Sequence, residues 1–249
     1  MPRFFLEACL DPAADTLQLA GADFHHIRDV LRLGPGDELI VCDGTRSDLR
    51  CRIRRFTAAA VELTVEERQA NHTEPSYRAI LYQGLAKGDK MDTIVQKAVE
   101  LGVFKIVPVI CRRSVARPDE NSLDRKLARW NRIAAEAAKQ CGRGQQPKVA
   151  RPLEFAAAVG AAATADICLI PWENERGRSL RQELETAAAD KPQPEISLLI
   201  GPEGGFAAEE TGLAFAAGIR PVTLGRRILR TETAGAAALA MLIYRFNDF

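Results

Sequence analysis

The stretch Ile196-Ser-Leu-Leu-Ile-Gly-Pro-Glu-Gly-Gly205 joins a short apolar run to a turn rich in glycine. Four other apolar runs, at residues 79–84, 104–110, 167–170 and 221–224, lie on either side of it, and stretches compatible with helices separate them. Strands that alternate with helices predict an α/β fold with a parallel, doubly wound sheet. Ligands of such sheets bind beyond the carboxyl ends of the strands. We therefore expect the glycine turn to lie at a ligand-binding edge.

Two further strands end in unusual turns, at residues 171–173 and 225–234, and both turns are expected at the same edge. The glycine turn is not a Walker A loop, because no Gly-Lys-Ser/Thr follows it. It is not a dinucleotide fingerprint either, because Pro202 and Glu203 break the glycine spacing. These differences argue against ATPase and dehydrogenase functions. For the glycine turn alone, a tight strand–helix connection remains the alternative.

The last of these turns leads into a C-terminal helix of small residues, which predicts close packing of its backbone. Thr231 and Thr233 are expected to cap this helix. Arg230 stands just before it, where an arginine beside a ligand can stabilise developing negative charge. From position alone, an ordinary surface arginine is an equal alternative.

Residues 1–70 are rich in β patterns and predict a small antiparallel barrel or sandwich. Asp43-Gly44 is typical of a hairpin turn. One short helix, capped by Asp23, is expected to bury one face; that face comprises Phe24, Ile27, Val30 and Leu31. The polar residues 66–76 show no periodic pattern and predict a polar connection, with the linker between domains at 71–76 and a second domain at 77–249. The alanine run at 155–165 predicts a surface helix.

The net charge is only +1, but residues 111–151 contain eleven basic and four acidic side chains. Such a block suits a polyanionic partner, and a solvated helix face is the alternative.

The six cysteines and three histidines are scattered, which argues against a metal site or a disulfide framework. No run reaches the roughly 18 apolar residues of a membrane span. We expect a cytoplasmic protein without membrane or metal.

Six segments together resemble the ribosomal RNA small subunit methyltransferase E family of the SPOUT superfamily. They are His26-Ile-Arg-Asp-Val-Leu-Arg32, Lys87-Gly-Asp-Lys-Met-Asp92, Gln96-Lys-Ala-Val-Glu-Leu-Gly102, Glu136-Ala-Ala-Lys-Gln-Cys141, Ile200-Gly-Pro-Glu-Gly-Gly-Phe206 and Leu224-Gly-Arg-Arg-Ile-Leu-Arg-Thr-Glu-Thr-Ala234. The resemblance covers nearly the whole chain, in order. It implies methylation of uridine N3 in 16S ribosomal RNA with S-adenosylmethionine as the methyl donor.

The resemblance also implies an N-terminal PUA-like RNA-binding domain, a deep trefoil knot in the C-terminal part of a SPOUT domain, and a homodimer. It implies that the three turns bind the cofactor. The residues are Pro171, Trp172, Glu173, Ile200, Gly201, Pro202, Glu203, Gly204, Gly205, Leu224, Gly225, Ile228, Leu229, Arg230, Thr231, Thr233 and Ala234. Arg230 is the expected charge stabiliser for the uracil carbonyls. Glu203 or Glu232 could serve as the base, and either could instead order the turns.

Basic residues are expected to contact the RNA backbone, which positions the RNA without specifying its sequence. They are Arg28, Arg32, Lys87, Lys90, Arg112, Arg113, Arg117 and Arg143. The partner is 16S ribosomal RNA or the small ribosomal subunit. Two other functions stay open at this point: a SPOUT methyltransferase for another base or for ribose, and a non-enzymatic assembly factor that binds ribosomal RNA.

Overall fold

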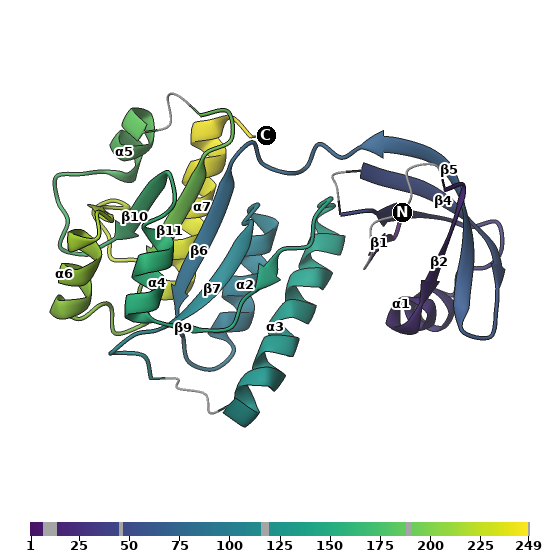
Figure 1. Ribbon diagram of the computed structural model, residues 1–249, viewed down its shortest axis with the longest axis horizontal. Coiled ribbons are helices and arrows are strands. Elements are labelled where there is room, and N and C mark those ends of the chain that lie inside the picture. Colours follow the sequence, from purple (N-terminus) through teal and green to yellow (C-terminus); the bar gives the residue numbers. More distant parts are fainter. Residues whose placement is uncertain (7–13, 45–46, 116–119, 188–190, 249) are drawn as a thin grey trace. The chain divides into compact units, whose positions relative to one another are not determined.

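Figure 1 presents the computed structural model, which describes residues 1–6, 14–44, 47–115, 120–187 and 191–248. The chain divides into two compact units. The small unit comprises Met1–Glu74 and Ala138–Gln146, and the large unit comprises Pro75–Ala137 and Pro147–Phe249. The small unit is therefore not continuous in sequence, because it takes in the last turn of a long helix and the residues after it. None of the helices in the described ranges is long and apolar enough to cross a membrane.

The small unit contains one curled five-stranded sheet (Figure 1). Its strands are β1 (Arg3–Phe5), β2 (Thr16–Ala20), β3 (Glu38–Cys42), β4 (Ser47–Phe56) and β5 (Ala60–Ala70). β2, β5, β4 and β3 pair in antiparallel fashion as predicted, whereas β1 runs parallel to β3. The sequence-based placement of residues 66–70 in a polar connection was wrong, because β5 continues to Ala70. Pairing with β4 stabilises this polar end of the strand.

The short helix of the small unit differs from the amphipathic helix that its sequence predicts. α1 spans Gly21–His25 and continues as a π-helix over His26–Val30. Asp23 lies within the first turn, and no side chain caps the start of the helix. Phe24 and Ile27 are buried in the core as expected, but Val30 is 69% exposed and Leu31 is 37% exposed. The hydrogen bond of a π turn spans five residues instead of the four of an α-helix, so α-helical spacing misplaces the residues that follow it.

The large unit is built on one parallel sheet with the order β12-β10-β11-β6-β7-β8, and β9 pairs with β7. The strands are β6 (Arg78–Gly84), β7 (Lys105–Ile110), β8 (Lys148–Val149), β9 (Leu153–Glu154), β10 (Ile167–Pro171), β11 (Glu195–Ile200) and β12 (Arg220–Val222). The described pairings are all parallel. β6 and β11 are buried almost throughout, which is typical of parallel strands covered on both faces.

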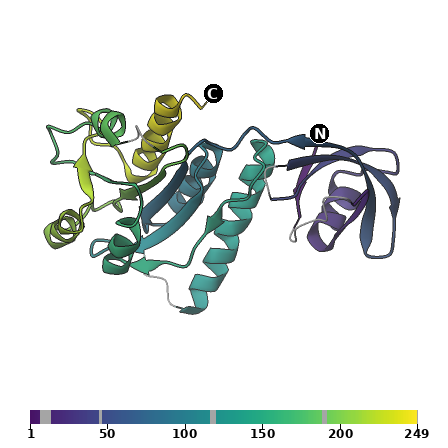
Figure 2. The same cartoon turned by 45° about the horizontal axis from the view of Figure 1, so that its top comes forward.

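Helices cover both faces of this sheet (Figures 1 and 2). They are α2 (Lys90–Glu100), α3 (Glu120–Gln140), α4 (Phe155–Ala162), α5 (Leu180–Ala187), α6 (Ala208–Ala216) and α7 (Thr231–Phe246). α4 and α6 contribute to a core with Ile80, Tyr82 and Leu199. α7 packs against α2 and approaches Leu81 and Gln83 on the opposite face, where Gly235 allows close contact. α4 is a surface helix as predicted, because Ala156, Ala157, Gly160 and Ala161 are exposed. Its other face is buried and comprises Phe155, Ala158, Val159 and Ala162.

Candidate active site

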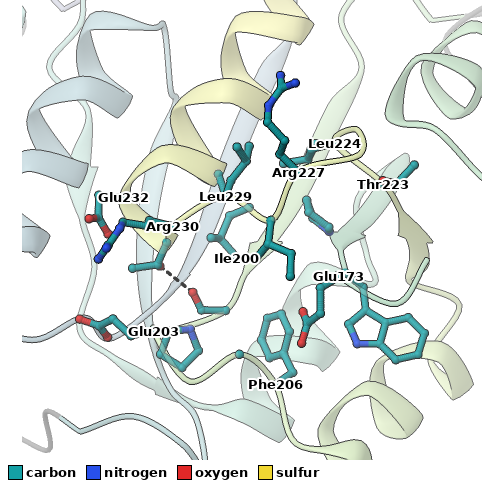
Figure 3. A pocket seen from close by; sticks show the side chains of 18 of the residues that line it. Glu173, Ile200, Glu203, Phe206, Thr223, Leu224, Arg227, Leu229, Arg230 and Glu232 are labelled. Atoms are coloured by element: carbon teal, nitrogen blue, oxygen red, sulfur yellow. Dashed lines mark hydrogen bonds between the residues drawn. The ribbon is translucent and has the colours of Figure 1, made fainter. Parts of the chain in front are cut away.

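A cavity of about 390 Å³ opens at the carboxyl edge of the parallel sheet, where the three predicted turns meet (Figure 3). This volume is within the range of small-molecule sites. The first turn continues from β10, the second from β11, and the third leads from β12 into α7. The lining residues are Lys90, Pro171, Trp172, Glu173, Arg176, Ile200, Gly201, Pro202, Glu203, Gly204, Gly205, Phe206, Thr223, Leu224, Gly225, Arg226, Arg227, Ile228, Leu229, Arg230, Thr231, Glu232 and Ala234.

Sixteen of the seventeen residues predicted to bind a cofactor line this cavity, and Thr233 is the exception. Thr233 is exposed one position beyond Glu232 on α7. Sequence reasoning missed Arg176, Phe206 and Thr223, which also line it. Arg226 and Arg227 line it as well, and they lie inside the predicted turn at residues 225–234. Phe206 follows the glycine turn directly, so its position was a usable signal. Arg176 comes from the segment between β10 and α5, for which no motif exists.

Thr231 joins two of the turns instead of capping α7. The N-cap position is Arg230, and no side chain caps the helix. The Thr231 hydroxyl donates a hydrogen bond to the carbonyl of Gly201 at 2.6 Å, drawn as the dashed line in Figure 3. It accepts one from the Nε2 atom of Gln83, at 2.8 Å. The prediction that Thr231 and Thr233 cap the helix was therefore wrong.

Backbone packing sets the shape of the cavity floor. A Cβ atom on Gly84, at the end of β6, would lie 2.5 Å from the nitrogen of Pro202. One on Gly201 would lie 3.3 Å from the ring of Phe206. Gly205 has a φ of +65°, and a Cβ there would lie 3.2 Å from a carboxylate oxygen of Glu173. Glycine is therefore required by space at Gly84 and favoured by backbone conformation at Gly205, whereas a Cβ on Gly201 would need the Phe206 ring to shift by a few tenths of an ångström.

Charged side chains gather on the side of the cavity that carries Arg230 (Figure 3). The Nζ atom of Lys90 lies 3.3 Å from Oε1 of Glu203 and 3.7 Å from Oε2 of Glu232. Among the described residues, Arg230 makes no hydrogen bond or ion pair through its side chain, so its guanidinium remains available. Oε2 of Glu232 is buried and accepts no hydrogen bond.

Glu203 is held more firmly than Glu232. Its Oε1 atom accepts a hydrogen bond from the backbone N–H of Lys87 at 3.0 Å. Partial burial by itself would raise the pKa of the Glu203 carboxyl, but hydrogen bonds from the backbone and from Lys90 outweigh it. The pKa therefore lies below its usual range. A carboxylate with a lowered pKa has little tendency to accept a proton, so this side chain orders the glycine turn and is a weak candidate for a base.

The residues predicted to contact RNA fall into different environments. Arg143 was predicted wrongly: its side chain is 4% exposed and forms an ion pair with Glu74 at 2.6 Å. Lys87 is exposed, as is Arg113, which donates a hydrogen bond to the carbonyl of Gly204. Arg112 pairs with Glu209. Arg28 is paired with Asp29, whereas Arg32 is exposed. Lys90 lines the cavity, and Arg117 lies outside the described residues.

The sequence matches the RNA methyltransferase domain family over residues 73–243 and the RNA methyltransferase PUA domain family over residues 19–55. It is 31% identical to the ribosomal RNA small subunit methyltransferase E of Bacillus subtilis, over 98% of this chain and 97% of that protein.

Solved structures agree with these sequence matches. The Neisseria gonorrhoeae ribosomal RNA small subunit methyltransferase E, bound to S-adenosylmethionine, has a TM-score of 0.85 and 32% identity, covering 98% of this chain and 97% of that one. A putative methyltransferase from Legionella pneumophila, also with S-adenosylmethionine, has a TM-score of 0.81 and 29% identity, covering 97% and 96% of the two chains. The two-domain architecture predicted from the sequence, a SPOUT-type parallel sheet and a PUA-like sheet, is confirmed. The chain belongs to the ribosomal RNA small subunit methyltransferase E family.

Proposed function

We propose that this protein transfers a methyl group from S-adenosylmethionine to N3 of a uridine in the 16S RNA of the small ribosomal subunit. The observation that carries the proposal is a cavity lined by three turns that are distant in sequence. It occurs in a chain similar along its whole length to a small subunit methyltransferase with S-adenosylmethionine bound.

The cavity suits this cofactor in shape and in chemistry. Gly201, Gly204 and Gly205 keep side chains off one wall, so a bent nucleoside can approach the backbone. Phe206 and Leu229 provide apolar surface, and Glu173 adds an exposed carboxylate that can accept hydrogen bonds from hydroxyl groups. The bound cofactor supplies the activated methyl group.

The chain's own residues activate the nucleophile, because N3 of uridine carries a proton at neutral pH that must be removed. Removal of that proton leaves negative charge on the flanking carbonyl oxygens. The guanidinium of Arg230 has no ion pair in the part of the chain that the structure describes and is placed to stabilise this charge, and one such donor is worth roughly 3 kcal/mol. Of the two candidate bases, Glu232 has a buried Oε2 that accepts no hydrogen bond and lies 3.7 Å from Nζ of Lys90, whereas Glu203 is bound by a backbone N–H. We therefore assign Glu232 to accept the proton.

Positioning accounts for a larger share of the rate enhancement. Alignment of two bound reactants contributes up to about 7–11 kcal/mol, compared with about 10²–10⁴-fold for a general base. Lys87, Arg112 and Arg113 lie at the same edge of the large unit as the cavity and would hold the RNA backbone there. The target uridine would have to be unpaired or flipped out of its helix to reach the cavity.

Three finer features belong to the same proposal. The chain forms a trefoil knot around the three turns, it acts as a homodimer with the cofactor sites close to the interface, and it works in the cytoplasm, where its ribosomal substrate is found.

The test is methylation of ribosomal RNA from a strain that lacks this gene. Purified protein and S-adenosylmethionine are added to isolated small subunits and, separately, to naked 16S RNA, and the nucleosides are then analysed by mass spectrometry. We expect one 3-methyluridine per molecule. A methyl group on ribose or on another base would refute the N3 assignment, and no transfer to either substrate would refute the activity.

A further inference from the structure

The segment His26–Arg32 of the small unit has an uncommon backbone. The N–H of Leu31 donates to the carbonyl of His26 at 2.9 Å, five residues earlier, which closes the π turn. π turns are rare in proteins and are frequent at functional sites. The turn directs Val30 and Leu31 into solvent, although the apolar spacing of the sequence would place them in the core.

Arg32 follows in the left-handed region, with a φ of +55°. Residues with a Cβ atom rarely adopt this conformation, and it persists where the surroundings enforce it. Here both flanks are fixed. The N–H of Leu33 donates to the carbonyl of Ile27 at 3.1 Å, and Leu33 packs against the core of the small unit. The N–H of Gly34 donates to Asp37 at 2.8 Å.

The two arginines of this segment differ in availability. Arg28 forms two hydrogen bonds with Asp29, at 2.7 and 2.9 Å, and its guanidinium lies 4.5 Å from the ring centroid of Phe24. Arg32 is exposed and has neither a hydrogen bond nor an ion pair among the residues that the structure describes. The cation of this segment that can bind an anion is therefore Arg32.

We propose that Val30, Leu31 and Arg32 form an RNA-docking tip that holds one unpaired nucleotide of the substrate RNA. Arg32 binds its phosphate, and Val30 and Leu31 contact the face of its base. The proposal rests on the proposed function, because RNA is taken as the substrate. Its occupant is single-stranded RNA because a nucleotide joins a negative charge to an apolar face, and base faces are covered in a duplex. A strained arginine beside two exposed aliphatic side chains matches that combination.

The test measures binding of a fluorescently labelled single-stranded RNA copied from 16S RNA, at several salt concentrations. Three variants are compared with the wild type: Arg32→Gly, Val30→Ser, and Arg54→Ala as a control. The control removes another exposed arginine of the same unit that, like Arg32, makes no hydrogen bond or ion pair among the described residues. Melting temperature is measured for each variant. Arg32→Gly should fold at least as stably as the wild type, because glycine relieves the left-handed strain.

We expect Arg32→Gly to weaken binding about tenfold and to reduce the slope of log affinity against log salt by about 0.7, the value for one phosphate contact on a single strand. Val30→Ser should weaken binding with an unchanged slope, and Arg54→Ala should bind like the wild type. If the segment had a purely structural role, RNA affinity would follow stability. Arg32→Gly, which should be at least as stable as the wild type, would then bind RNA at least as tightly.

Two outcomes would overturn the proposed docking tip and leave the proposed function intact. One is wild-type affinity in both tip variants while the wild type binds and methylates RNA. The other is unchanged affinity for the oligonucleotide with lost activity on assembled subunits, which would identify a ribosomal protein as the occupant. A wild-type protein that binds no RNA at any salt concentration would remove the proposed function as well.

Discussion

The hydroxyl of Thr231 donates a hydrogen bond of 2.6 Å to the carbonyl of Gly201, joining the start of α7 to the glycine turn after β11. A residue of β6, Gln83, determines which group the Thr231 hydroxyl donates to. Because the Nε2 atom of the fully buried Gln83 donates to the same hydroxyl at 2.8 Å, the single hydroxyl proton is left for Gly201. The strands β6 and β11 and the helix α7 are thereby linked at the cavity.

Replacement of Thr231 tests this link. Thr231→Val keeps the shape of the side chain but leaves the Gly201 carbonyl without a partner and leaves the Gln83 amide with only its bond to the carbonyl of Gly84, which costs about 1–3 kcal/mol. We expect a lower melting temperature and S-adenosylmethionine binding about tenfold weaker by calorimetry. Thr231→Ser restores the hydroxyl and should retain most of the affinity. Equal affinities of the valine variant and the wild type would show that the link does not shape the cavity.

Arg230 should matter for turnover and little for cofactor binding. Its guanidinium is unpaired among the described residues, so Arg230→Ala breaks no internal ion pair. We expect kcat on small subunits to fall about 10²–10³-fold, as for the loss of one donor to a developing oxyanion. The dissociation constant for S-adenosylmethionine should change less than threefold. Unchanged turnover in the alanine variant would remove Arg230 from the chemical step.

Substitutions of Glu232 and Glu203 should have different effects. Glu232→Gln should lower kcat at neutral pH and leave cofactor affinity intact, because Glu232 is assigned the proton. Glu203→Gln should weaken the turn instead, which is read as reduced melting temperature and cofactor affinity. A large kcat effect in Glu203→Gln together with normal turnover in Glu232→Gln would reverse the assignment of the base.

The effect of Glu203 should also depend on pH. Its pKa is lower in the folded protein than in the unfolded chain, so its contribution to stability is present above the unfolded pKa, near 4.3. The contribution disappears as pH falls through the folded value. The difference in melting temperature between the wild type and Glu203→Gln should therefore be constant at neutral pH and shrink at acid pH. A difference that grows on acidification would contradict the lowered pKa.

Local periodicity was sufficient for much of the large unit. The helix predicted at residues 90–101 corresponds to α2 (Lys90–Glu100), because the buried residues Ile94, Val95 and Ala98 follow regular α-helical spacing. The parallel sheet was predictable because apolar runs alternate with helical stretches. The meeting of the three turns in one cavity followed from the rule that ligands bind at the carboxyl edge of such a sheet.

Contacts between distant segments could not be predicted in this way. Gln83 lies in an apolar strand with no motif, and its role depends on Thr231, a residue 148 positions away. Arg143 was predicted as an RNA contact because the sequence does not show that its charge is buried. The burial depends on the ion pair with Glu74, a residue distant in sequence. The exposure of Val30 was missed for another reason: a single π turn shifts the periodicity on which the prediction depended.

Gly84 offers a test of the cavity floor that sequence reasoning did not suggest. In Gly84→Ala the new methyl group would lie 2.5 Å from the nitrogen and 2.6 Å from Cδ of Pro202, both in a rigid ring. The glycine turn must shift, and we expect S-adenosylmethionine affinity to fall more than tenfold. Gly160→Ala is the matched control, because a Cβ atom there meets nothing within 4 Å and the residue lies in α4. It should keep full affinity and gain up to about 1 kcal/mol of stability.

The ion pair between Glu74 and Arg143 should be essential for the small unit. Both side chains are 4% exposed, and Oε1 of Glu74 also accepts the backbone N–H groups of Gly144 and Gln145 at 3.0 Å. Arg143→Ala would leave a buried carboxylate without its countercharge, which costs about 3–5 kcal/mol. Chemical denaturation should show this loss, and Arg151→Ala, which removes an exposed partner of Asp124, should change stability by less than about 1 kcal/mol. If Arg143→Ala instead kept its stability and lost only RNA affinity, Arg143 would be an RNA contact after all.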